Sequence, residues 1–200
     1  MKKRIIIFNG VHGAGKSALA EEVVARDNRF AFYPEIGRQV REEVTYNALQ
    51  SSEPFDREVM RRELARDLKL AQEPKIPLVE TWHIGNIGYL YARSPQLIDE
   101  YRGQLLEKLE VFEPFCFFVN IDWGIFRLRA TEKIRSEEMD ELVAFYRVIK
   151  DATFQLYEDL KVPYQLVDNR DTFSAGLAVL RAHLDTFCEH EAGQNGDGAE

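Results

Sequence analysis

The sequence has 200 residues, a length typical of one domain, and 45% of them are hydrophobic and 30% charged. This balance excludes wholesale disorder and is typical of a soluble globular protein. The net charge of −8 argues against a groove that follows a nucleic-acid backbone, because such a groove needs clustered lysines and arginines. It still allows a small phosphorylated ligand, which needs only a few local positive groups.

Strand-like and helix-like segments alternate along the chain. In chain order, the pattern predicts a strand at 5–8, a helix at 16–25, a strand at 30–33, helices at 37–49 and 55–72, a strand at 76–81, helices at 83–92 and 96–111, a strand at 115–121, a helix from about 123, a long helix at 136–160, a strand at 164–167 and a helix at 171–189. The turn-forming residues at 51–54 are expected to separate the two helices beside them.

Five strands separated by helices predict a three-layer α/β/α fold with a five-stranded, mostly parallel sheet. In such sheets ligands bind beyond the carboxyl ends of the strands, so the polar residues that follow each strand are candidates for the site. Residues 1–189 are expected to form one domain. Residues 190–200 are polar and acidic without lysine or arginine, which favours a disordered tail.

Targeting signals and metal motifs are scarce in the sequence. The apolar run at 5–8 is too short for the core of an export signal, and no stretch reaches the roughly 20 apolar residues of a membrane span. The two cysteines, Cys116 and Cys188, are too few for a disulfide framework or a cysteine-rich zinc site. We therefore expect a cytoplasmic protein that binds neither membranes nor nucleic acid, and dimerisation stays open.

The segment GVHGAGKS at 10–17 is the most specific motif in the sequence. It fits the phosphate-loop pattern G-x-x-x-x-G-K-[ST] and stands between a predicted strand and a predicted helix. Its glycines let backbone N–H groups wrap around phosphates, and the helix adds the positive end of its dipole. Lys16 is expected to reach the β- and γ-phosphates of ATP, and Ser17 to bind Mg²⁺. The residues predicted to contact the nucleotide are Gly10, His12, Gly13, Ala14, Gly15, Lys16, Ser17 and Ala18.

The sequence lacks the motifs of other classes of nucleotide-binding protein. There is no guanine-reading N-K-x-D segment and no LSGGQ signature, and 200 residues leave no room for an added helical sensor domain. A small P-loop kinase is the class that remains.

Four segments over about residues 4–170 carry a resemblance to a known family. They are GVHGAGKS at 10–17, FYPE at 32–35 followed by Arg38, LVETW at 78–82, and the basic stretch at 127–138. With them the chain resembles the P-loop nucleoside and nucleotide kinases, nearest to deoxynucleoside kinases and thymidylate kinases, with some likeness to NadR-type ribosylnicotinamide kinases.

The resemblance implies roles for individual residues. Glu35 stands where deoxynucleoside kinases place the acid that activates the acceptor hydroxyl, and Arg38 gives the E-x-x-R spacing of the NadR-type enzymes. The basic stretch is similar to an arginine-rich helical lid, which implies catalytic roles for Arg129 and Arg135. The segment at 80–82 lacks the arginine that the family carries second there. Either Arg38, Arg41 or Arg93 fills that role, or the acceptor differs from the usual one.

We therefore predict an ATP-dependent kinase that transfers the γ-phosphoryl group to a nucleoside or nucleotide. The predicted residues are Lys16, Glu35, Arg129 and Arg135 for catalysis, Glu35, Arg38 and Trp82 for the acceptor, and Ser17 and Glu80 for Mg²⁺. The alternatives are a nucleotide-dependent switch or partner-binding module, and an ATPase that drives a partner. Glu35 and the basic residues near Arg135 favour the kinase, because a switch needs neither.

Each of these residues also has a purely structural interpretation. Glu35 can interact with a helix dipole, Glu80 can be a solvated acid, and Trp82 can pack in the core. The arginines at 38, 129 and 135 can belong to solvated helix faces, as we expect for Arg57, Arg61, Arg62 and Arg66.

Overall fold

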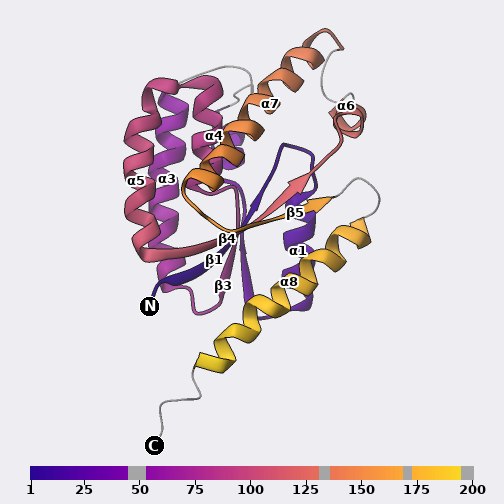
Figure 1. The fold of residues 1–200 in the computed structure, drawn as a ribbon. Coiled ribbons are helices and arrows are strands. Elements are labelled where there is room, and N and C mark those ends of the chain that lie inside the picture. The colour runs from indigo at the N-terminus through magenta and orange to yellow at the C-terminus, as the bar shows by residue number, and fades with distance from the viewer. Residues whose placement is uncertain (45–52, 131–135, 169–172, 195–200) are drawn as a thin grey trace, which may run out of the picture.

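A computed structural model describes residues 1–44, 53–130, 136–168 and 173–194 (Figure 1). Its centre is a five-stranded sheet in the order β2-β3-β1-β4-β5, and every neighbouring pair of strands is parallel. The strands are β1 (Lys3–Asn9), β2 (Phe30–Tyr33), β3 (Ile76–Glu80), β4 (Phe112–Asn120) and β5 (Tyr164–Asp168). All five predicted strands and the parallel arrangement are confirmed.

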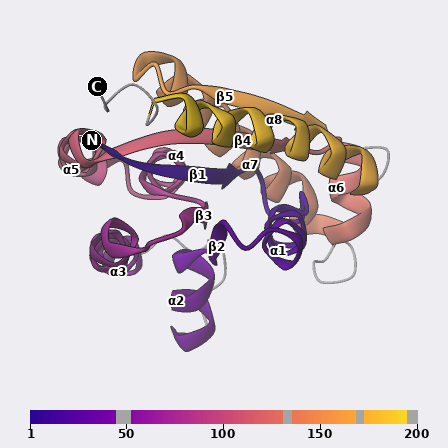
Figure 2. The same ribbon diagram turned by 90° about the horizontal axis from the view of Figure 1, so that it is seen from below.

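Helices cover both faces of this sheet, as Figures 1 and 2 show. One face carries α1 (Lys16–Arg26) and α8 (Phe173–Gln194), and the other carries α3 (Glu53–Gln72), α4 (His83–Arg93), α5 (Ile98–Val111) and α7 (Ser136–Asp159). The shorter α2 (Ile36–Val44) packs on α3, α6 (Trp123–Ala130) follows β4, and the 3₁₀ turn η1 (Pro95–Leu97) joins α4 to α5. The three layers of the predicted fold are therefore present.

Side-chain alternation along β1 divides the core into two. Ile6 and Phe8 pack with residues of α1 and α8, whereas Ile5 and Ile7 pack with residues of α4 and α5, and all four are fully buried. A strand in the middle of a parallel sheet is covered on both faces, which is why residues 5–8 of β1 are all apolar. Each such side chain contributes roughly 1.5–3 kcal/mol on burial.

Some boundaries differ from the sequence-based expectation. Helix α3 begins at Glu53, with Pro54 inside its first turn, where the backbone N–H that proline lacks has no partner within the helix. Strand β3 ends at Glu80 because Thr81 has a φ of +48°, outside the β region. Helix α8 reaches Gln194, five residues beyond its expected end.

Several predicted features lie outside the described residues: the end of the helix expected at 37–49, the lid segment 131–135 with Arg135, and residues 195–200 of the tail. Among the helices that the structure does describe, none combines the length and the apolar character that crossing a membrane requires.

Candidate functional site

The loop at 10–17, between β1 and α1, has the backbone shape that phosphate binding requires. Gly10, Gly13 and Gly15 have φ values of +135°, +77° and +94°, in a region that other residues rarely adopt. A Cβ atom on Gly10 would lie 2.3 Å from the carbonyl oxygen of Val119 in β4, so this position also has no room for a side chain. No described side chain caps the N-terminus of α1, and its first turn has no acidic residue. Its first amides are therefore left for an anionic ligand.

Asn9, the last residue of β1, holds this loop in place. Its side-chain oxygen accepts a hydrogen bond from the Gly10 N–H at 2.8 Å, and its amide nitrogen donates to the hydroxyl of Tyr157 in α7 at 3.3 Å. Asn9 is buried, and its contact with Tyr157 is sheltered from water. The loop is thus tied to a helix on one face of the sheet as well as to β1.

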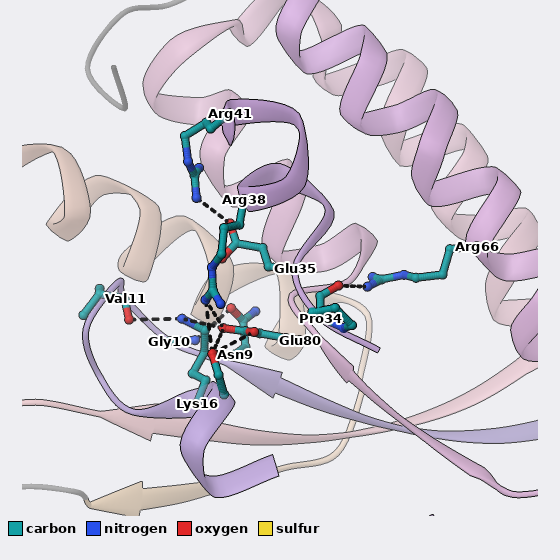
Figure 3. A network of polar contacts seen from close by, with 11 residues as sticks. Asn9, Gly10, Val11, Lys16, Pro34, Glu35, Arg38, Arg41, Arg66 and Glu80 are labelled. Atoms are coloured by element: carbon teal, nitrogen blue, oxygen red, sulfur yellow. Dashed lines mark hydrogen bonds and ion pairs between the residues drawn. The ribbon is translucent and has the colours of Figure 1, made fainter. Parts of the chain in front are cut away.

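Lys16, Ser17, Arg38 and Glu80 meet where β1 and β3 end (Figure 3). The two strands are neighbours in the sheet and Phe8 pairs with Glu80, which brings this carboxylate beside the loop. The Ser17 hydroxyl donates to Glu80 and lies 3.0 Å from each carboxylate oxygen. Arg38 Nη2 donates to Glu80 Oε1 at 3.0 Å and to Ser17 Oγ at 3.1 Å. Three polar partners therefore surround one carboxylate that is 1% exposed.

Lys16 is buried beneath the loop. Its ammonium lies 3.8 Å from Glu80 Oε1 and donates to the carbonyl oxygen of Val11 at 3.2 Å. Burial lowers the pKa of Lys16, and the nearby carboxylates of Glu35 and Glu80 oppose that effect. The side chain that the motif assigns to the phosphates is therefore held among groups of opposite charge at the bottom of the loop.

Glu35 is a second buried carboxylate, placed between the end of β2 and the start of α2. It is 3% exposed, and Arg41 Nη2 donates to its Oε1 at 3.2 Å (Figure 3). Burial alone would raise the pKa of Glu35, but Arg41, Lys16 and Arg38 outweigh it and hold the pKa below its ordinary value. Glu35 is therefore ionised at neutral pH and able to accept a hydrogen bond or a proton from a hydroxyl group.

Among the residues that the structure describes, two groups of side chains are candidates for holding a divalent cation. Ser17 and Glu80 offer hard oxygen ligands beside the phosphate loop, which is the donor set that Mg²⁺ prefers. The second group is Glu63, Asp67 and His83, all buried. Its two carboxylates already form ion pairs with Arg66 and Lys108, so their charges are balanced without a metal. The chemistry of the residues therefore favours the first group.

The other predicted site residues are divided between the loop and the core. Arg129, exposed on α6, donates from Nη1 to the carbonyl oxygen of Gly13 at 2.7 Å and thus reaches the loop. His12 and Ala18 are exposed and Ala14 is buried. Trp82 is fully buried, its indole N–H donates to Asp67 at 3.0 Å and its ring packs edge-on against Phe112.

Trp82 therefore lies in the core cluster beneath α4 and α5, the structural interpretation that the sequence left open. Its complete burial there favours the structural interpretation over the substrate role predicted from the sequence.

Two residues beside the site, Asn9 and Arg66, were not predicted from the sequence. Arg41 was one of three candidates for the missing arginine, but its pairing with Glu35 was not predicted. Arg66 was expected on a solvated face with Arg57, Arg61 and Arg62, but it is 5% exposed. A signal was present, because the buried positions Val59, Met60, Glu63, Asp67 and Leu70 follow helical spacing, and two of them are acidic. Acidic residues within the apolar stripe of a helix indicate buried cationic partners.

No protein-family profile matches the sequence, and no curated protein matches it either. The structure is similar to that of thymidylate kinase from Candida albicans, with a TM-score of 0.64 and 13% identity, over 94% of this chain and 94% of that chain. It is also similar to thymidylate kinase from Ehrlichia chaffeensis, with a TM-score of 0.56 and 13% identity, over 90% of this chain and 98% of that chain. At this level of identity the similarity defines the fold, and the chain has the P-loop α/β fold of the thymidylate kinases.

Proposed function

We propose that the protein is a magnesium-dependent kinase that transfers the γ-phosphoryl group of ATP to a nucleotide or nucleoside acceptor. The observation that carries the proposal is the second buried carboxylate. A phosphate loop with Lys16 and the oxygen ligands of Ser17 and Glu80 would serve any nucleotide-binding protein. An ionised Glu35 lies beside the same loop, with Arg38 and Arg41 next to it. These three side chains can orient a second substrate.

Each residue has a distinct role in this mechanism. The loop amides and Lys16 hold the phosphates of ATP. Ser17 and Glu80 would hold Mg²⁺, which would supply additional neutralisation of the phosphate charge. Glu35 accepts a hydrogen bond from a hydroxyl group of the acceptor. In a nucleoside this is the attacking hydroxyl, whose proton passes to Glu35, and in a nucleotide it is a sugar hydroxyl that fixes the position of the attacking phosphate oxygen. Arg38 and Arg41 supply positive charge where the acceptor and the transferring group meet. In this arrangement Arg38 is the arginine that replaces the one absent from the segment at 80–82.

The fold supports a nucleotide as the acceptor, since thymidylate kinases act on thymidylate. The test is a panel of ADP-release assays with Mg²⁺ and ATP, in which nucleoside monophosphates, nucleosides and ribosides are added one at a time. We expect one acceptor class to stimulate ADP release well above the rate without acceptor, and Lys16→Met to reduce the stimulated rate by at least about 100-fold. Equal release with and without every acceptor would point to an ATPase instead. Binding of ATP without turnover in all assays would point to a switch.

Substituting Glu80 should weaken the binding of Mg²⁺ more than the binding of the nucleotide. Glu80→Gln keeps the shape of the side chain but removes the negative charge from beside Ser17. We expect the apparent affinity for Mg²⁺ in the presence of ATP to fall about 10–100-fold, the usual effect of losing a residue that orients or charges a metal site. Magnesium titrations with a fluorescent ATP analogue measure it, with Glu21→Gln on the exposed side of α1 as control. Equal magnesium affinity in the Glu80 variant and wild type would remove Glu80 from the metal site.

A further inference from the structure

Arg66 in α3 joins the two loops that carry the buried carboxylates. Its Nη1 donates to the carbonyl oxygen of Pro34 at 2.9 Å (Figure 3), and its Nη2 donates to the carbonyl oxygen of Thr81 at 2.8 Å. Pro34 directly precedes Glu35, and Thr81 directly follows Glu80. One planar guanidinium group is therefore bonded to the backbone beside both carboxylates.

The hydrogen bonds of Arg66 lie just beyond the point where the backbone ladder between β2 and β3 ends. The ladder between β2 and β3 extends to the pair Tyr33 and Val79. The residue that follows β2 is Pro34, which has no N–H to donate, and Thr81, which follows β3, has a φ of +48°. That value is strained for a β-branched residue and persists only when its surroundings hold it. Arg66 supplies two hydrogen bonds at this point, in place of the ladder.

The guanidinium group is itself fixed from two helices. Glu63, one turn earlier in α3, accepts from Arg66 Nε at 3.0 Å and also accepts from Nη2. Its other oxygen accepts from the side-chain amide of Asn86 in α4 at 2.9 Å. Arg66 is 5% exposed and Glu63 is fully buried, so the charges are paired away from water. A guanidinium held this rigidly does more than neutralise one acid.

We propose that Arg66 is a positioning residue that sets the separation between Glu35, on the acceptor side, and Glu80, on the donor side. The proposal rests on the proposed kinase function, because only a transfer between two substrates depends on that separation. It assigns Arg66 no contact with either substrate: it acts through the backbone of Pro34 and Thr81. Misplacing a reacting group by about 1 Å can cost on the order of 10²-fold in rate, so the effect is measurable.

The first test does not depend on activity. Arg66→Lys keeps a positive charge for Glu63 but cannot donate to both carbonyl groups in the planar geometry of arginine. We expect faster amide hydrogen exchange in the segments 30–36 and 78–84 of the variant than in the wild type. Arg62→Lys, one turn earlier on the same helix in partly exposed ion pairs with Glu43 and Glu58, is the matched control and should leave exchange unchanged. Unchanged exchange in the Arg66 variant would overturn the proposal, whether or not the protein is a kinase.

The second test separates positioning from simple loss of stability. We expect Arg66→Lys to lower kcat about 10–100-fold with the KM for ATP changed less than about threefold. In a protein that already carries Glu35→Gln, adding Arg66→Lys should lower kcat much less than it does in the wild-type protein. The reason is that both substitutions disturb the positioning of Glu35. If the two substitutions lower kcat by independent factors, or if kcat per folded molecule of Arg66→Lys equals that of the wild type, Arg66 has only a structural role.

Two further outcomes have defined meanings. If wild-type protein transfers no phosphoryl group to any acceptor, the proposed function fails, and the exchange experiment still decides whether Arg66 fixes the two loops. If Arg66→Lys does not fold, Glu63→Gln replaces it, since that change removes the charge that orients Arg66 and keeps its shape. The same pattern of exchange and kcat, smaller in size, supports the proposal, and its absence overturns it.

Discussion

Lys16→Met should lower kcat by about 10²–10³-fold while the protein stays folded. The ammonium of Lys16 is the positive charge at the bottom of the phosphate loop, 3.8 Å from Glu80. Charge on the transferring phosphoryl group reaches its maximum in the transition state, so one preorganised donor typically contributes about 2.7–4 kcal/mol to lowering the barrier. Methionine keeps the length of the stem and avoids the cavity that alanine would leave.

The stability of this variant should change little. Burial lowers the pKa of Lys16, which means that the fold disfavours its charged form, and removing the charge relieves that cost. Glu80 keeps Arg38 and Ser17 as partners. We expect melting temperatures of the two proteins within about 5 °C, measured by thermal unfolding, with Lys75→Met at an exposed position as control. Normal turnover by folded Lys16→Met protein would contradict the kinase proposal.

Glu35→Gln should lower turnover with the true acceptor by about 10²–10⁴-fold and leave nucleotide affinity nearly unchanged. Glutamine keeps the hydrogen bond to Arg41 but lacks the negative charge that orients and receives the proton of a hydroxyl group. The loop at 10–17 binds the phosphates without Glu35, so affinity for ATP should be retained. Slow hydrolysis of ATP by water should also persist.

Steady-state kinetics and binding of a fluorescent ATP analogue measure the two quantities separately. Glu42→Gln, at an exposed position of the same helix, is the control. Joint loss of nucleotide binding and activity would assign Glu35 to the metal or the fold. An unchanged rate would remove it from the site and transfer the acceptor-orienting role to Glu80.

The charge state of Glu35 also predicts a pH dependence. The pKa of Glu35 in the folded protein lies below its ordinary value of 4.5. Its ionised form therefore stabilises the fold above that pH, and the stabilisation is lost as the pH falls through the folded-state pKa. For the same reason, kcat/KM of the free enzyme should show no acid limb from Glu35 between about pH 5 and pH 8.

Local patterns in the sequence predicted the fold and the loop. The apolar runs of β1 and β4 and the glycine spacing at 10–17 are properties of neighbouring residues, and each is read without knowing what lies across the sheet. Topology made Glu35 and Glu80 candidates, since one follows β2 and the other ends β3, and the carboxyl ends of these parallel strands share one edge. The role of Glu35 came from the resemblance to the deoxynucleoside kinases.

The remaining residues depend on contacts between distant segments. Trp82 also follows β3, but it turns into the core because Asp67, 15 residues earlier, accepts its indole N–H. Arg66 leaves the solvated face because carbonyl groups 32 and 15 residues away lie within its reach. The directions in which the side chains of Trp82 and Arg66 point do not follow from residue spacing along one helix. They are set by how α3 packs beside β2 and β3.

The position of β4 in the sheet has a consequence for aggregation. Its segment FCFFV at 115–119 is uncharged, aromatic and free of proline, the composition of segments that stack into amyloid. In the native sheet β4 is paired on one side with β1 and on the other with β5, so its backbone groups are not open to another chain. The edges are left to β2 and β5, of four and five residues, and β2 is closed by Pro34. A stretch with this composition is thereby kept in the interior of the sheet, and short strands that make poor templates occupy its borders.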